Sequence, residues 1–370
     1  MTTTFGVEED FVFLDPATLR PADVAARVHE ELLEEPEWAP HVRREFLASQ
    51  LEHASAVFDS LEAARAPLAE FRRRIAERAE ELGVSVAGIG ATPDALPFPA
   101  VSHLEKYEPV VRDMAGLIGD HQFTTLDVHV GVPDREAGVV AINTIRPWIP
   151  LLTALGGNSP FWRGYDTGYE SWRTIQLRRW PTAGTPPRFR GATDYEHRLR
   201  ALLVASGTDD PGFVMWNARL SEHLPTVEFR MADAQLTVAD TLCIAALCRG
   251  LVDYALETEG GEPGEADVHG DVLSAAVMHA AQAGLRDDLY DPSTGDPAPA
   301  RTVLDRLLER IGPALEPTGE SDVVLELTAR MVQLGTGASR QRSAFRRGGV
   351  HELSSLFGTS MTADAWPRAA

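Results

Sequence analysis

Cysteine is scarce in this chain of 370 residues, which has only two. Cys243 and Cys248 lie five residues apart in a segment with helical periodicity, and at about 100° per residue they occupy different helix faces. A disulfide between them is therefore not expected. Because the fold is not expected to need a disulfide bond, we expect the protein to act in the reducing cytoplasm.

Long apolar runs and basic residues are also few. No apolar run reaches the roughly 18 residues that span a bilayer, and the N-terminus lacks the basic and apolar regions of a secretory signal. Lys and Arg number 34 against 55 Asp and Glu, which gives a net charge of −21. This charge repels nucleic acid and anionic membranes, so we expect neither as a partner, although a local basic pocket for an anionic substrate remains compatible with it.

Three common catalytic motifs are missing. The sequence has no nucleotide-binding P-loop and no strand–GxGxxG–helix unit, so any ATP would be held by metal and arginines. It also has no G-x-S-x-G elbow, which argues against a serine hydrolase.

The segment FGVEEDFVFLDP, which starts at Phe5, has the alternation of a strand but carries three consecutive acids. Alternation places Glu8 and Asp10 on one face and Glu9 on the apolar face. Two carboxylates about 7 Å apart disfavour each other's ionisation, and a divalent cation is the usual compensation. The alternative is a frayed terminal strand with solvated acids.

Three further strand-like segments repeat this pattern of polar residues on one face. They lie near residues 45–58, 123–132 and 226–231, and a further strand is expected near 213–219, joined to the last by a short turn. The combined open face would carry Glu8, Asp10, Gln50, Glu52, Asp127, His129, Glu228 and Arg230. Taken singly, the Glu228–Arg230 pair could be a surface salt bridge and His129 a core histidine.

Helices are expected for 237–257, 270–284, 300–314 and 321–334, and residues 155–195 are expected to form a long loop. Strands scattered among helices indicate an α+β fold whose antiparallel sheet has one face on helices and one face open to a cavity. Carboxylates with a single histidine suit Mg²⁺ or Mn²⁺, and arginine among them suits an anionic substrate or a transferring phosphoryl group.

Five segments together resemble the carboxylate–amine ligases of the glutamate–cysteine ligase type 2 family, from about residue 4 to about residue 350. These are FGVEEDFVFLDP, LDVHVGVPDRE, NSPFWRGYDTGYESWRTIQLRRWPTAGTPPRF, HLPTVEFRMAD and GTGASRQR. The resemblance implies a glutamine-synthetase-like fold, with a curved antiparallel sheet, helices on its outer face and the active site on its inner face. It also implies ATP and Mg²⁺ as cofactors, with Mn²⁺ as an alternative metal, and small-molecule carboxylate and amine substrates.

The resemblance also implies roles for particular residues. Metal positions would be Glu8, Asp10, Glu52, His129 and Glu228. Catalytic arginines would be Arg230, Arg146 and Arg173, on phosphate or the substrate carboxylate. Nucleotide contacts would come from His129, Arg219, Asn158, Ser159, Asp166 and Arg340.

Several positions depart from the family pattern. Asp127 stands where a histidine is usual, Thr92 replaces the histidine of a Gly-Thr-His-Pro segment, and His53 replaces an apolar residue. Met278, His279 and Gln282 stand where Trp, Arg and Arg are common, on a helix that we expect to face the pocket. On this basis we expect a changed substrate pair.

The resulting prediction is one catalytic domain over residues 1–350, with a helical portion at about 237–350, a flexible tail at 358–370 and a homo-oligomeric assembly. Its activity would be ATP-dependent amide formation through an acyl phosphate, with glutamate and cysteine as default substrates. Alternatives are a ligase for another acid and amine in specialised metabolism, a phosphagen-kinase-like phosphotransferase, and a weakly active binding homologue.

Overall fold

The computed structural model describes residues 3–102, 108, 112, 115–258, 268–363 and 366. Its centre is a seven-stranded antiparallel sheet with the order β2-β3-β1-β5-β9-β8, in which β4 pairs with the end of β1. The strands are β1 (Phe5–Leu14), β2 (Val42–Arg44), β3 (Gln50–Ala54), β4 (Ser85–Ala87), β5 (Thr125–Gly131), β8 (Ala218–Leu220) and β9 (Thr226–Asp233). The predicted α+β class is confirmed.

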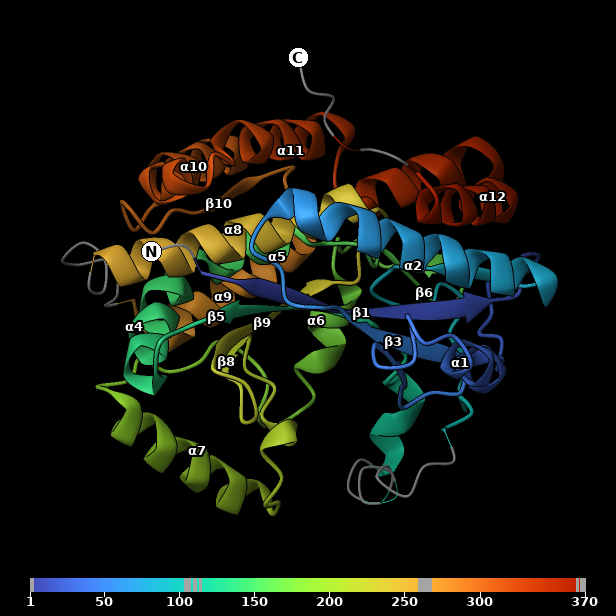
Figure 1. The fold of residues 1–370 in the computed structure, drawn as a ribbon, viewed down its shortest axis with the longest axis horizontal. Helices are drawn as coiled ribbons and strands as arrows, with labels where there is room; N and C mark the ends of the chain where they lie inside the picture. The colour runs from blue at the N-terminus through green and yellow to red at the C-terminus, as the bar shows by residue number, and fades with distance from the viewer. Residues whose placement is uncertain are drawn as a thin grey trace.

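Helices cover one face of this sheet (Figure 1): α2, α8 and α12 pack on the strands, and α10 and α11 form a further layer on α8. The helices are α1 (Ala25–Leu33), α2 (Leu61–Glu81), α4 (Arg135–Ile145), α5 (Ile149–Leu155), α6 (Trp172–Leu177), α7 (Ala192–Ser206), α8 (Val238–Glu257), α9 (Gly270–Ala283), α10 (Ala300–Leu315), α11 (Ser321–Leu334) and α12 (Gly337–Met361). The predictions for α8, α9, α10 and α11 are confirmed to within one residue at each end.

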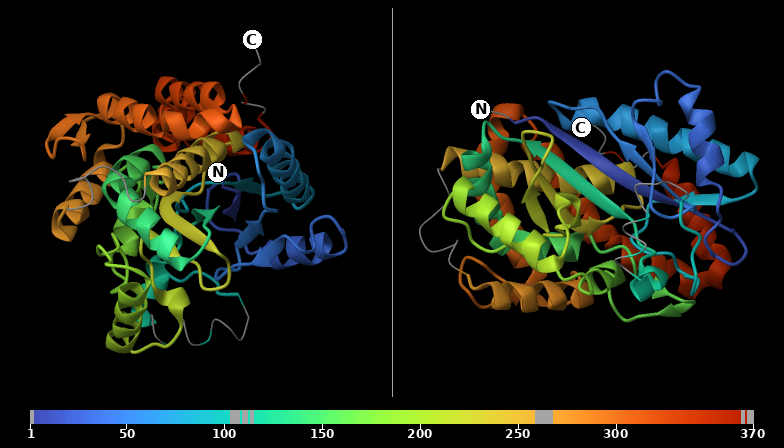
Figure 2. Two further views of the ribbon diagram at one scale, coloured as in Figure 1. Left: turned by 60° about the vertical axis from the view of Figure 1, so that its left-hand side comes forward. Right: turned by 90° about the horizontal axis from the view of Figure 1, so that it is seen from below.

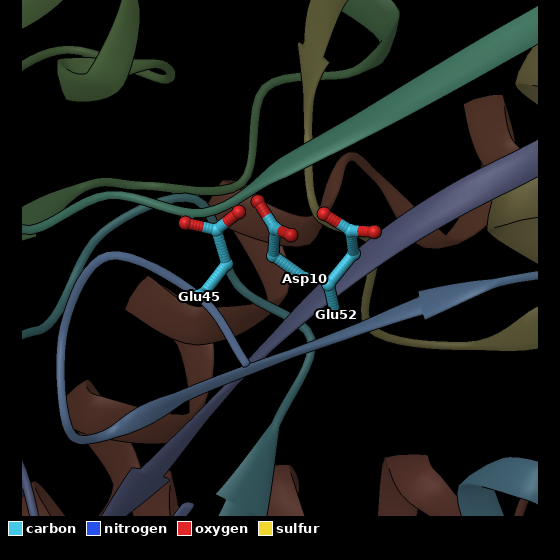
Figure 3. Close-up of side chains that lie close together, drawn as sticks. All are labelled: Asp10, Glu45 and Glu52. Atoms are coloured by element: carbon cyan, nitrogen blue, oxygen red, sulfur yellow. The ribbon is translucent and has the colours of Figure 1, made fainter. Parts of the chain in front are cut away.

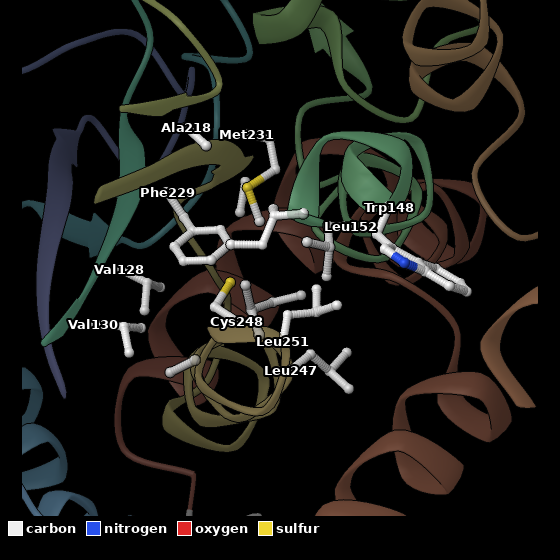
Figure 4. Packing of buried hydrophobic residues seen from close by; sticks show 14 of the residues in the cluster. Val128, Val130, Trp148, Leu152, Ala218, Phe229, Met231, Leu247, Cys248 and Leu251 are labelled. Carbon is white, nitrogen blue, oxygen red and sulfur yellow. The ribbon is translucent and has the colours of Figure 1, made fainter. Parts of the chain in front are cut away.

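The main core lies between the sheet and α8. Val128 and Phe229 project from the strands toward Leu247 and Leu251 of α8, with Trp148 nearby (Figure 4). Along each strand, this packing directs every second residue, the apolar one, toward the helices. The intervening polar residues therefore point to the other face, where β1 and β5 are visible from below the sheet (Figure 2).

Three predictions about segments need correction. Residues 155–195 are not one loop, because they contain α6 and a short hairpin of β6 (Phe161–Trp162) and β7 (Tyr165–Asp166). Helix α6 is capped at its N-terminus by Ser171, whose side chain accepts a hydrogen bond from the Thr174 N–H. The strand expected at 213–219 covers only β8, because residues 211–213 form a 3-10 turn. The expected tail at 358–370 begins inside α12, which continues to Met361.

The segment from Arg135 to Leu155, which includes α4 and α5, is long and apolar enough to cross a membrane by length and composition. It is not an uninterrupted apolar run, because it contains Asn143 and Arg146. In addition, 89% of the apolar window is buried inside the protein, as in the core helix of a soluble fold.

Candidate active site

The open face of the sheet forms the floor of a cavity of about 660 Å³. All eight residues expected on this face line the cavity, which confirms the predicted alternation in four strands. They are Glu8, Asp10, Gln50, Glu52, Asp127, His129, Glu228 and Arg230.

Strand register explains why these side chains gather. Residues directly opposite each other on antiparallel strands share a face, so each pairing adds a polar side chain beside the last. The opposed pairs are Asp10 with Glu52, Glu8 with Asp127, His129 with Glu228, and Arg219 with Glu228.

One end of the cavity holds a cluster of three carboxylates. Single oxygens of Asp10, Glu45 and Glu52 lie within 4.8 Å of one another (Figure 3). Burial, together with Glu45 and Glu52, raises the pKa of Asp10 well above its usual range. Close oxygens that repel one another in the metal-free protein are the donor set that a hard divalent cation prefers, so these residues fit the predicted metal.

Glu45 was missed in the sequence analysis. Strict alternation through residues 45–54 places it on the face opposite Glu52, but β2 ends at Arg44 and a turn precedes β3. The turn breaks the alternation and brings the Glu45 carboxylate back beside Glu52. The break between two short strands has no strong Gly or Pro signal in this sequence, so periodicity could not reveal it.

Glu8 lies beside this cluster and is also perturbed. Burial raises its pKa to about 8, and Glu52 and Asp127 contribute in the same direction. His129 Nε2 lies 3.8 Å from Glu8 Oε1. Glu8 is therefore positioned to extend the cation site toward His129.

We expect the metal-free protein to lose stability as the pH rises from 4.5, the ordinary pKa of Glu8, through about 8. Because the folded state holds this proton more tightly than the unfolded state, the contribution of Glu8 is fully present below that window and lost above it. Melting temperatures between those pH values should fall more for the wild type than for Glu8→Gln. If the melting temperatures of both proteins change in parallel with pH, Glu8 does not have the raised pKa of a buried carboxyl group.

The other end of the cavity is built from arginines. Arg219 donates from Nε to Glu228 Oε2 at 2.8 Å and from Nη2 to Oε1 at 3.0 Å, and Arg230 Nη1 donates to Oε1 at 2.6 Å. Burial raises the pKa of Glu228, but Arg230 and Arg219 outweigh it and lower the pKa to about 2. Both Glu228 oxygens accept hydrogen bonds from guanidinium groups, so Glu228 anchors two arginines, while its role as a metal ligand stays a prediction.

His129 presents one ring nitrogen to the cavity. Its Nδ1 lies 3.0 Å from Thr226 Oγ1, while buried Nε2 has no hydrogen-bond partner within the described part of the chain. Burial lowers the pKa of His129, so the ring is neutral near pH 7. In the tautomer that donates Nδ1–H to Thr226 Oγ1, Nε2 can act as the predicted ligand or as an acceptor.

Aromatic rings close one side of the cavity. His121 lies 4.1 Å from Phe123 and 5.2 Å from Trp180, measured between ring centroids, and Trp180 lies 5.8 Å from Phe213. Burial lowers the pKa of His121 to about 3, so this wall is uncharged. These rings give the cavity an apolar side.

Three of the predicted site residues lie outside the cavity lining. Arg146 is buried and donates from Nε to a backbone carbonyl 2.7 Å away. Arg340 Nη2 lies 2.6 Å from Asp240 Oδ2. The third residue, Asp166, pairs through Oδ2 with Nε of Arg342 at 2.8 Å. These side chains are engaged in contacts between helices and loops, so the structure does not bring them together with the strand residues.

Asn158 and Ser159 also lie outside the cavity lining. The Asn158 backbone N–H and the Ser159 hydroxyl each donate to Asp233 Oδ2 at 2.7 Å, and both residues are buried. Both residues make contacts within the protein, and their nucleotide contacts stay a prediction. Arg173 is different, because it does line the cavity.

The departures from the family pattern have different surroundings. Asp127 lines the cavity, with Oδ2 3.6 Å from Arg230 Nη2. His53 is buried on the opposite side of β3, where it stacks on Phe71 at a centroid distance of 3.8 Å, and burial lowers its pKa to about 3. Thr92 is buried and does not line the cavity.

Helix α9 does not face the cavity as predicted. It packs on α5 and α6, with His279 and Gln282 exposed and Met278 half-buried. His279 Nε2 lies 2.8 Å from the carbonyl oxygen of Asp288. The predicted change of substrate pair through these three residues therefore has no geometric basis.

We accordingly expect Gln282→Arg to leave kcat/KM within about threefold of the wild type for every acid and amine tested, since a threefold change is only about 0.6 kcal/mol. Steady-state kinetics with saturating ATP checks this. A tenfold gain with glutamate would restore α9 to the substrate pocket.

Solved structures share this fold. A glutamate–cysteine ligase from Francisella tularensis, determined in complex with AMP, gives a TM-score of 0.71 at 10% identity and covers 99% of this chain and 90% of that chain. A bifunctional glutathione synthetase from Pasteurella multocida gives 0.70 at 14% identity, covering 97% and 52%. Together with the sequence matches below, the fold and its charged cavity define an ATP-dependent carboxylate–amine ligase.

The chain belongs to the glutamate–cysteine ligase family 2, whose model matches residues 4–356. A relative from Saccharopolyspora erythraea, provisionally named glutamate–cysteine ligase 2-2, is 38% identical over 353 residues, covering 95% of this chain and 90% of the relative. A relative from Salinispora tropica with the provisional name glutamate–cysteine ligase 2 is 39% identical over 349 residues, covering 94% and 92%. The predicted resemblance is confirmed.

Proposed function

We propose that this protein joins the γ-carboxylate of glutamate to an amine, with cysteine as the default amine. The observation that carries this proposal is the division of one cavity into a carboxylate end, at Asp10, Glu45 and Glu52, and an arginine end, at Arg219 and Arg230. A cation and a phosphate chain fit the first end, and an anionic acid or phosphoryl group fits the second. The provisional names of the relatives support glutamate and cysteine.

The carboxylate end would hold Mg²⁺, or Mn²⁺, through Asp10, Glu45 and Glu52, with Glu8 and His129 beside them. The metal would supply positive charge at the phosphates of ATP. Arg230 lies between Glu228 and Asp127, at 2.6 Å and 3.6 Å, and this pairing fixes its guanidinium at the cavity surface. From there it would bind the oxygens of the transferring group.

The reaction divides into two balanced steps. A γ-carboxylate oxygen of glutamate attacks the terminal phosphorus of ATP, and the bond to the bridging oxygen breaks to release ADP. The amine nitrogen then attacks the acyl carbon, the carbon–oxygen bond breaks, and the amide, phosphate and a proton leave. The aromatic wall would keep water from the acyl phosphate between the steps.

The other candidate functions remain as outcomes of one experiment. The protein would be incubated with ATP, Mg²⁺, a panel of carboxylates that includes glutamate and a panel of amines that includes cysteine. ADP and amide in equal amounts with glutamate and cysteine would support the proposal. Faster amide formation with another acid and amine would identify a specialised ligase. A stable phosphorylated product would identify a phosphotransferase, and the absence of ADP would identify a binding homologue. Each of these three results would contradict the proposal.

A further inference from the structure

Arg173 is a buried cation with an unused donor. Its Nε donates to Asp233 Oδ1 at 2.7 Å and its Nη2 to the Met231 carbonyl oxygen at 2.7 Å. The side chain is only 1% exposed, and its buried Nη1 has no hydrogen-bond partner among the residues that the structure describes. An unpaired buried donor on a guanidinium is unfavourable, and Arg173 lines the cavity. Nη1 is therefore available to an oxyanion bound there.

Asp233, the last residue of β9, has no exposed surface and accepts four hydrogen bonds. Arg173 Nε and Ser171 Oγ donate to Oδ1, and Ser159 Oγ and the Asn158 N–H donate to Oδ2, each at 2.7 Å. These four bonds occupy the lone pairs of both carboxylate oxygens. The carboxylate orientation is therefore fixed from two directions.

Gly90 restricts the same carboxylate from a third direction. A Cβ atom on Gly90 would lie 2.3 Å from Asp233 Cγ, so the Gly90 backbone packs directly against the carboxylate group. Any larger residue at this position would displace Asp233. The close approach leaves the Asp233 carboxylate little room to rotate. The carboxylate therefore fixes the orientation of the Arg173 guanidinium that donates to it.

The donors to Asp233 come from the two ends of one loop. Asn158 and Ser159 begin this loop, and Ser171 and Arg173 end it, where the Arg173 backbone N–H also donates to Ser159 Oγ at 3.1 Å. Four residues of a single segment thus converge on one carboxylate at the end of β9. This convergence explains why Asn158 and Ser159 are buried instead of lining the cavity.

We propose that Asp233 is a positioning residue, which closes the loop 158–173 and orients Arg173 so that Nη1 binds an oxyanion in the cavity. The oxyanion is either a phosphate of the nucleotide or the carboxylate of the acid substrate. This inference deepens the proposed ligase function and rests on it, because both oxyanions are substrates of that reaction. Misplacement of a binding group by about 1 Å can cost a hundredfold in rate, so a remote carboxylate can control it.

The test compares Asp233→Asn with Asp253→Asn, a buried control on α8 whose carboxylate also faces an arginine, Arg249, at 3.8 Å. Calorimetry would give the Kd of Mg-ADP and of glutamate, and kinetics the KM of ATP and glutamate. We expect Asp233→Asn to raise the Kd and KM of one ligand about 10- to 100-fold. A rise for the nucleotide identifies phosphate, and a rise for glutamate identifies the carboxylate.

A double-mutant cycle separates positioning from general support of the fold. Arg173→Lys should weaken the same ligand, and adding Asp233→Asn to it should weaken that ligand no further. If Asp233→Asn does not fold, Ser171→Ala, which removes one bond to Asp233, replaces it in the same cycle. The inference would be overturned if Asp233→Asn weakened the ligand equally in the wild type and in Arg173→Lys, or if it left both ligand affinities unchanged. It would also be overturned if Asp253→Asn weakened the same ligand to the same extent.

Failure of the proposed function gives a different result. A wild-type protein that binds Mg-ADP and glutamate but forms no amide with any amine contradicts the ligase proposal, while the binding constants still test Asp233. A wild-type protein that binds neither Mg-ADP nor glutamate would overturn the inference itself.

Discussion

Asp10→Asn is expected to reduce ADP formation by about a thousandfold while leaving the metal-free protein at least as thermally stable as the wild type. The first effect follows because the cation loses a charged ligand, and metal stabilisation of transferring phosphate is worth several kcal/mol. The second follows because Asp10 is buried beside Glu45 and Glu52, which raise its pKa, so an amide relieves repulsion. Asparagine can still accept the 2.9 Å bond from the Thr125 N–H.

Single-turnover ADP release and melting temperature, both measured with and without Mg²⁺, check this expectation. Asp305→Asn is a suitable control, because the Asp305 side chain is 46% exposed, lies outside the cavity lining and pairs with Arg301 one helix turn away. Mg²⁺ should raise the melting temperature of the wild type and of the control, but not of Asp10→Asn. Near-normal turnover in Asp10→Asn at moderate Mg²⁺ would remove the cation from this cluster.

Glu9→Gln is expected to lower the free energy of unfolding by about 3 kcal/mol, because it leaves a buried arginine without its counter-charge. Glu9 is 1% exposed and pairs with Arg72, which has no exposed surface. Thr241 Oγ1 also donates to Glu9 at 2.6 Å. The neighbouring Glu8 faces the cavity, where it lies 3.8 Å from His129 Nε2 instead of pairing with a buried arginine.

Denaturant unfolding of Glu9→Gln and Glu8→Gln therefore forms a matched comparison of adjacent residues on opposite faces of β1. Glu9→Gln should shift the midpoint strongly and retain activity per folded molecule. Glu8→Gln should keep or raise the midpoint near neutral pH, because the buried carboxyl with the raised pKa is replaced by a neutral amide, and it should lose activity. The reverse assignment would mean that the register of β1 is misread.

Alternation predicted the part of the site that lies on strands. The spacing of Glu8 and Asp10, and of Asp127 and His129, is enough to place each pair on one face, because a strand leaves its side chains only two directions. Apolar partners such as Phe229 then decide which face is buried. This part of the site follows from local sequence alone.

Loops and helix breaks could not be predicted in the same way. Glu45 reaches the cavity through a turn that breaks alternation. The helical portion predicted at about 237–350 covers only the first half of α12, because Gly348 and Gly349 interrupt its periodicity there, with φ of −161° and 62°. The role of Asn158 depends on a contact with Asp233, 75 residues away. A polar loop residue that binds a ligand and one that supports a carboxylate have the same local pattern, and only the fold separates them.

The central claim is that this cavity transfers a phosphoryl group to the γ-carboxylate of glutamate before an amine is joined. It is tested most directly with glutamate labelled with heavy oxygen in its γ-carboxylate, together with ATP, Mg²⁺ and cysteine. The account predicts that one labelled oxygen per turnover appears in inorganic phosphate, in equal amount with the amide, as an acyl phosphate requires. Amide formed with unlabelled phosphate, or ADP formed without transfer of label, would contradict it.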